Sequence, residues 1–191
     1  MKKYYLVFGL LFFSIILSAQ KKELCIIKTA LGDITIELYS SKAPVTVANF
    51  LKYVDAHLYD SSSFFRAVTL NNQPKNKVKI EVIQGGNVDS AKEFPAIPLE
   101  TTKQTGLLHK DGTISMARAE PATATSSFFI CINNQPSLDF GGKRNPDGQG
   151  FAAFGKVIKG MDIVKKIQQL HPNEEQYFKT PVKIFSIERY R

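Results

Sequence analysis

The stretch from Phe64 to Gly86 contains the side chains whose types and spacing could do chemistry. Arg66 follows two phenylalanines, and Gln84 stands directly before a Gly-Gly pair, each in a short apolar run typical of a strand. A buried guanidinium costs free energy unless it meets a partner. We therefore expect Arg66 beside an apolar cleft, where it can donate hydrogen bonds to a bound molecule. The competing interpretation is that a core carboxylate holds this arginine.

Two further runs accompany this stretch, GTISMAR at 112–118 and SFFI at 127–130. In this order, the three segments resemble the cyclophilin family of peptidyl-prolyl isomerases, and the resemblance extends from about Ile26 to Arg189. It implies an enzyme that accelerates rotation about X-Pro bonds without a cofactor or a metal ion. The partners that it implies are proline-containing peptides and unfolded proteins.

The resemblance also gives roles to single residues. Arg66 matches the catalytic arginine of the family. Gln84 and Arg118 stand where polar contacts to the peptide occur, and the small Ala117 stands where the substrate backbone passes close. The walls of the proline pocket are implied to be Val82, Phe129, Leu138 and Phe151.

One position departs from the family pattern. Glu81 occupies the place of a pocket residue that is usually aromatic, so we count it among the substrate-binding positions. A carboxylate there could pair with Arg66 and weaken its hydrogen bonding. Alternatively, the polar insertion at 71–79 shifts the register and presents Ile80 to the pocket. Glu81 is also the feature that favours a second function, a non-catalytic chaperone or adaptor that binds proline-containing segments.

The elements that must position these residues are mostly short strands. Apolar alternation predicts strands at 24–28, 34–38, 114–117, 128–132, 151–158 and 182–188. Two more are expected, one that begins at Phe64 and one that ends at Gln84. Many short strands with few helices indicate a mainly β, closed architecture. The resemblance makes this sharper: a closed eight-stranded antiparallel β-barrel capped by two α-helices.

Apolar residues at helical spacing predict those two helices at 44–57 and 161–170. Ser40 and Ser41 are candidate N-caps of the first helix, and Pro44 fits its first turn. The segment 95–106 has turn residues and little periodicity, so it is interpreted as irregular. The segment 139–150, rich in Gly, Asn and charge, is expected to be a long exposed loop.

The N-terminal segment is typical of a secretory signal peptide. Lys2 and Lys3 precede an uncharged run at 4–17, followed by Ser-Ala-Gln, and the run is short for a membrane span of about 20 residues. We expect a signal peptide at 1–19 and a cyclophilin-like domain at 20–191. The mature protein would be a monomer in a bacterial periplasm without stable membrane association; an uncleaved anchor is the alternative.

Composition narrows the classes of partner. The chain has 191 residues and a net charge of +8 without a long basic block. The nearest to one is Lys75, Lys77 and Lys79, which indicates a solvated loop and no nucleic-acid partner.

The remaining residues with metal or redox chemistry show no site pattern. His57, His109 and His171 lack metal-ligand spacing, so exposed or locally bonded imidazoles are expected. Export would permit a disulfide between Cys25 and Cys131, but both stand in apolar strand-like runs, and we expect two buried thiols.

Overall fold

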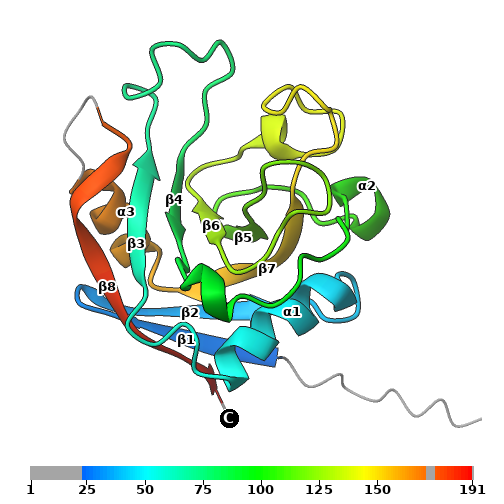
Figure 1. Cartoon of the computed structure of the whole chain (residues 1–191). Helices are drawn as coiled ribbons and strands as arrows, with labels where there is room; N and C mark the ends of the chain where they lie inside the picture. The colour runs from blue at the N-terminus through cyan, green and yellow to red at the C-terminus, as the bar shows by residue number, and fades with distance from the viewer. Residues whose placement is uncertain (1–22, 171–174, 191) are drawn as a thin grey trace, which may run out of the picture.

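The computed structural model describes residues 23–170 and 175–190, so the expected signal peptide lies outside the described part of the chain. The described strands close into one antiparallel barrel in the order β1-β2-β7-β5-β6-β4-β3-β8 (Figure 1). The expected eight-stranded barrel is thereby confirmed. The strands are β1 (Glu23–Thr29), β2 (Gly32–Leu38), β3 (Ser63–Val68), β4 (Val82–Gly85), β5 (Thr113–Met116), β6 (Phe128–Cys131), β7 (Ala152–Lys159) and β8 (Tyr177–Tyr190).

Alternation along each strand divides the inside of the barrel from its outside. In the β1–β2 hairpin, Cys25 and Ile27 face inward opposite Ile36 and Ile34, and all four are fully buried. Their neighbours along the strand point outward because successive side chains of a strand alternate between faces. The inward residues form one continuous apolar core.

Two longer helices pack against the barrel, as expected. In α1 (Pro44–Asp55), Phe50 contacts the rings of Phe128 and Phe154 at centroid distances of 5.7 and 5.2 Å. In α3 (Met161–Gln169), Val164 and Ile167 are fully buried. Figure 1 shows α3 behind β3 and α1 at the lower edge of the molecule.

Three short helical segments were not expected. They are α2 (Thr102–Thr105) and the 3₁₀ turns η1 (Ser90–Lys92) and η2 (Pro136–Leu138). The segment 95–106 is therefore not wholly irregular: Thr101 and Gln104 form a reciprocal capping box around the first turn of α2. Thr-x-x-Gln is a local signal that could have been found in the sequence.

The start of α1 corrects a second expectation. The N-cap residue is Ala43, and neither Ser40 nor Ser41 caps the helix. The carboxylate of Glu100 instead accepts hydrogen bonds from the backbone N–H groups of Val45 and Thr46, at 3.2 and 2.8 Å. An acidic group at this end also suits the positive end of the helix dipole.

Both cysteines are buried, free thiols, as expected. Burial raises the pKa of Cys25 to about 12 and raises the pKa of Cys131 well above its ordinary value.

No helix within 23–170 or 175–190 is both long and apolar enough to cross a membrane.

Gly155 provides a test of how closely the barrel is packed. A Cβ at Gly155 would lie 2.4 Å from the carbonyl oxygen of Glu37 on the neighbouring strand. We predict that Gly155→Ala lowers the free energy of unfolding by about 3 kcal/mol or more, since two backbones would have to separate. Urea unfolding followed by circular dichroism measures this change.

The control is Gly148→Ala, where no atom lies within 4 Å of the added Cβ and only a φ of +65° opposes it. That variant should lose about 1 kcal/mol. Equal losses in the two variants would contradict the close strand contact.

Candidate functional site

An irregularity in β3 directs Arg66 to the outside of the barrel. Pairing with both β4 and β8 shifts register between Phe64 and Arg66, which marks a bulge at Phe65. Phe64 and Ala67 pack in the interior core, whereas Val68 belongs to a second apolar cluster. Regular alternation would place residues 64 and 67 on opposite faces, so the bulge is what puts Arg66 on the outer face with Val68.

The strands beside β3 contribute the other outward residues. Val82 and Gln84 of β4 pair with Cys131 and Phe129 of β6. Val82, Phe129 and Cys131 share the second apolar cluster with Val68, while the residues between them along the strands belong to the core. The outer face of these three adjacent strands therefore carries an apolar cluster beside Arg66 and Gln84.

A cavity of about 230 Å³ lies over this face. It brings together eight of the nine residues predicted for the site, and its lining combines apolar side chains with polar and charged ones. Its lining consists of Arg66, Ile80, Val82, Gln84, Ala117, Arg118, Phe129, Leu138, Arg144, Asn145 and Phe151. The aromatic rings of Phe129 and Phe151 meet edge to face at 5.3 Å, which gives the cavity two perpendicular flat walls.

Neutral amides hold Arg66. Its Nη1 donates to Gln84 Oε1 at 3.0 Å, and its Nε and Nη2 donate to Gln176 Oε1 at 3.1 and 2.5 Å. No carboxylate of the described chain pairs with this guanidinium, so the competing interpretation of a core ion pair finds no support. Burial lowers the pKa of Arg66 below its ordinary value, yet an arginine remains cationic at neutral pH.

Gln176 is a residue of the site that sequence reasoning missed. Its Nε2 donates to the backbone oxygen of Asn72 at 3.0 Å, which orients its Oε1 toward Arg66. The ring of Tyr177 also lies 5.6 Å from the Arg66 guanidinium carbon. Gln176 is separated from Arg66 by 110 positions and lies in no motif that the sequence analysis recognised, so no local signal could have revealed it.

Arg118 lines the cavity as predicted, but its donors are occupied. Its two Nη atoms donate to the carboxylate of Asp147 at 2.7 and 3.0 Å, and its Nε donates to Gly150 O at 2.8 Å. The ion pair lowers the pKa of Asp147. In this arrangement Arg118 fixes the 139–150 loop as a wall of the cavity. The polar contact to a bound peptide that the resemblance implies for Arg118 stays a prediction.

Glu81 does not line the cavity, which corrects its expected placement. Its carboxylate accepts a hydrogen bond from Asn133 Nδ2 at 2.9 Å, and Ile80 lines the cavity instead. Alternation explains the difference, because residues 80, 82 and 84 share one parity and residue 81 has the other. Of the two alternatives for this position, the structure matches a register that presents Ile80.

A buried histidine supports the floor of the cavity. His109 Nδ1 lies 2.7 Å from Asp139 Oδ1 and its Nε2 lies 3.0 Å from Ser115 Oγ. The imidazole stacks on Phe129 at 5.9 Å. His109 is thus locally bonded, His57 is exposed, and His171 lies outside the described residues. Over the described ranges, no three His, Cys, Asp or Glu side chains form a group that could hold a metal ion.

Comparison with known proteins agrees with this geometry. A family model described as cyclophilin type peptidyl-prolyl cis-trans isomerase/CLD matches residues 24–189. The chain is 36% identical over 168 residues to a peptidyl-prolyl cis-trans isomerase of Acinetobacter baylyi, which covers 84% of this chain and 82% of that protein. It is 35% identical over 167 residues to peptidyl-prolyl cis-trans isomerase A of Dickeya dadantii, with coverage of 86% and 80%.

Solved structures support the fold. The crystal structure of a cyclophilin type peptidyl-prolyl cis-trans isomerase from Cryptosporidium parvum superposes with a TM-score of 0.71 at 22% identity, covering 90% of this chain and 99% of that one. A second structure of the same protein, in the presence of the dipeptide Ala-Pro, gives a TM-score of 0.69 at 23% identity, with coverage of 88% and 99%.

The histidine network predicts a stability effect. His109→Leu removes the partner of two polar groups and leaves Asp139, whose side chain is only 15% exposed, with fewer hydrogen bonds. We predict a loss of about 2–4 kcal/mol in the free energy of unfolding, because a poorly solvated carboxylate would lose a partner. Urea denaturation measures it.

His57→Leu is the matched control, since that side chain is 72% exposed. It should change stability by less than about 0.5 kcal/mol. Similar small losses in both variants would argue against a structural role for the buried network.

Proposed function

The chain belongs to the cyclophilin-type family of peptidyl-prolyl cis-trans isomerases, and from this premise we propose that it uses Arg66 to accelerate rotation about X-Pro bonds in exported proteins, assisting their folding. Residues of a single chain line the whole cavity, so no second copy is needed to complete it, and we propose that the protein acts as a monomer. The ligands of this site are proline-containing segments of peptides and unfolded proteins.

Rotation about an X-Pro bond is slow because resonance gives the C–N bond partial double-bond character. The barrier is about 18–20 kcal/mol, and uncatalysed exchange takes tens to hundreds of seconds. In the twisted state the prolyl nitrogen becomes pyramidal and regains its lone pair. A cation that donates a hydrogen bond to this nitrogen stabilises the twisted state more than either planar state, so it lowers the barrier.

The observation that carries the proposal is the bonding of Arg66. Its partners are side-chain amides, which orient the guanidinium without neutralising its charge. A carboxylate partner would offset the positive charge that the twisted amide requires. The burial that lowers the pKa of Arg66 also strengthens its electrostatic action, because fewer water molecules screen it.

The cavity beside Arg66 suits a proline ring. Its apolar walls are Val82, Phe129, Leu138 and Phe151, and none of these side chains brings a charge to the place where the ring would lie. The relative from Cryptosporidium parvum whose structure was determined in the presence of Ala-Pro is consistent with a proline ligand for this fold. Binding the ring holds the amide nitrogen within reach of the guanidinium.

The alternative function, a non-catalytic chaperone or adaptor, loses the feature that favoured it. That feature was a Glu81 carboxylate in the pocket, and Glu81 bonds to Asn133 outside the cavity. The isomerase is therefore the function that the site supports best.

Export is supported by the order of residues at the N-terminus. Lys2 and Lys3 precede the uncharged run at 4–17, and Ser18-Ala19 offers small residues for cleavage. On this basis the mature enzyme works in a bacterial periplasm, free of the membrane after cleavage.

The isomerase assignment predicts the effect of removing the cation. Arg66→Ala should lower kcat/KM for a proline peptide by about 100-fold or more, the usual effect of losing one donor to a transition state. The fold should be retained, because Arg66 lies on the outer face of the barrel. A coupled proline assay and circular dichroism measure the two effects.

A second variant tests the role of the neutral amides. Gln176→Glu places a carboxylate against Arg66 and should also reduce kcat/KM, with the fold intact. Unchanged turnover in both variants would overturn the assignment of Arg66. If the wild-type protein binds the peptide without accelerating cis-trans exchange of its X-Pro bond, the result would favour the non-catalytic chaperone or adaptor.

The export proposal predicts a processed N-terminus. Expressed in a bacterium with its full sequence, the protein should be released by osmotic shock and begin at Gln20. N-terminal sequencing decides this, and an intact Met1 in a membrane fraction would instead indicate an uncleaved anchor.

A further inference from the structure

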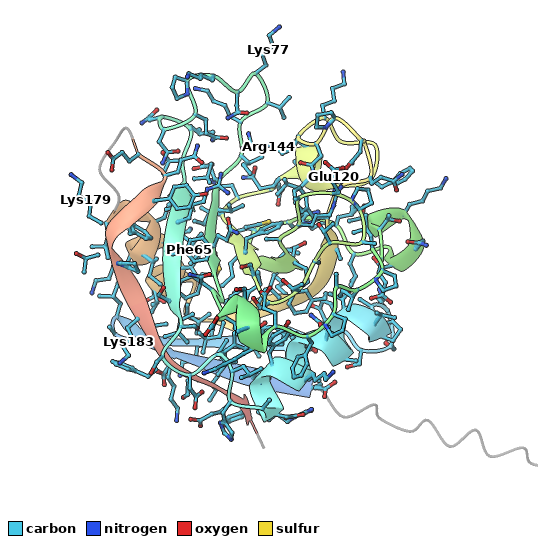
Figure 2. The ribbon with its side chains drawn as sticks, in the orientation of Figure 1. Phe65, Lys77, Glu120, Arg144, Lys179 and Lys183 are labelled. Carbon is cyan, nitrogen blue, oxygen red and sulfur yellow. The ribbon has the colours of Figure 1, made fainter. Side chains whose placement is uncertain are left out.

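Arg144 connects two loops above the cavity. The first, the 69–81 loop, links β3 to β4, and the second, the 139–150 loop, precedes β7. Arg144 Nη1 donates to Gln73 Oε1 at 2.8 Å and to Val78 O at 2.7 Å, so one loop is tied to the other. Figure 2 shows Arg144 in the space between the loop that carries Lys77 and the yellow loop.

The same side chain lines the cavity together with Arg66. Both of its hydrogen-bond partners are neutral, and within the described chain only Nη1 is bonded to the protein. Its Nε and Nη2 can therefore donate to a ligand. Burial, and then repulsion by Arg66, lower the pKa of Arg144, which agrees with two cations facing one space.

The surrounding loops add positive charge. The 69–81 loop carries exposed Lys75, Lys77 and Lys79, and the 139–150 loop carries exposed Lys143. The acidic residues of the same loops are already bonded within the protein. Glu81 bonds to Asn133, Asp139 to His109, and Asp147 to Arg118.

The three arginines that line the cavity therefore differ in their partners. Arg118 is neutralised by Asp147, and all its donors are engaged. Arg66 and Arg144 line the same cavity with no carboxylate partner in the described part of the protein. Two like charges held close together repel, and an anion that binds between them relieves this repulsion.

We propose that the pocket selects proline-containing segments with an acidic side chain directly before or directly after the proline, and that Arg144 pairs with this carboxylate. The inference rests on the proposed isomerase function and adds a substrate class to it. Arg144 is the specificity-determining residue, whereas Arg66 acts on the prolyl nitrogen. A planar guanidinium with free Nε and Nη2 donors suits a carboxylate, which it can bind through two parallel hydrogen bonds.

The expected effect is moderate. Arg144 is partly exposed, and pairs of this kind contribute little in water, so a selectivity of about threefold in kcat/KM is expected at low salt. Because the attraction is electrostatic, it should weaken as salt screens it.

The experiment compares short proline peptides that differ only in Glu or Gln, a pair of similar shape and different charge. One pair places the variable residue directly before the proline, and the other places it directly after. Exchange rates measured by NMR give kcat/KM for each peptide at 20 mM and 500 mM NaCl. We expect a Glu/Gln ratio of about three for at least one pair at low salt, falling toward one at high salt.

Two variants assign the selectivity to Arg144. Arg144→Gln removes the charge while its amide can still donate to Val78 O, and it should bring the Glu/Gln ratio to about one. Lys143→Gln removes the same charge from the adjacent exposed position, outside the cavity lining, and should preserve the ratio. A ratio taken within one protein cancels any general loss of activity in a variant.

A ratio near one for both pairs in the wild-type protein would overturn the inference, provided that all the peptides are isomerised. An equal fall in the ratio for Arg144→Gln and Lys143→Gln would also overturn it, since it would show a diffuse field and no pairing with Arg144. Absence of catalysis on every peptide is a different result, which would refute the proposed function itself.

Discussion

The site depends on a guanidinium that is oriented but not neutralised. Arg66 is partly buried, so its charge is costly, and the protein stabilises it through the amide oxygens of Gln84 and Gln176. Amides fix the direction of the donors and leave the net positive charge in place. A carboxylate in either position would have been the more common partner for a buried arginine, and it would have removed the charge that a twisted prolyl amide needs.

The barrel can hold such an arginine because its inner and outer faces carry two separate apolar clusters. Interior residues such as Phe64 and Phe128 form the core, and outer residues such as Val82 and Phe129 form a separate apolar cluster. The bulge at Phe65 shifts the alternation of β3 by one residue, so Arg66 points to the outer face of the barrel and not into the core. The sheet then holds the Arg66 guanidinium beside the apolar side chains of the cavity. His109 stacks on one of them, Phe129, and so helps to fix its position.

The loops over the site bring a further arginine to the cavity. The 69–81 and 139–150 loops, which both contribute residues to the cavity lining, are joined by Arg144 through neutral acceptors. Both loops lie at the upper side of the molecule in Figure 1. Arg144 also keeps its net positive charge, because no carboxylate of the described chain pairs with it. The arginine beside the apolar pocket is thus combined with a rim whose charge is set by two loops.

Alternation and helical spacing were sufficient for most of the strands and the two longer helices, because both are properties of neighbouring positions. The closed eight-stranded order and the eight cavity residues were instead implied by the resemblance to the cyclophilin family, which rests on short motifs. Glu81 was misplaced, since the register through the 71–79 insertion depends on how that loop folds. Three further contacts required the tertiary structure: Glu100 at the start of α1, Gln176 on Arg66, and Asp139 on His109. They join residues 54, 110 and 30 positions apart, and no local pattern encodes which distant polar group the folded chain brings to a given donor.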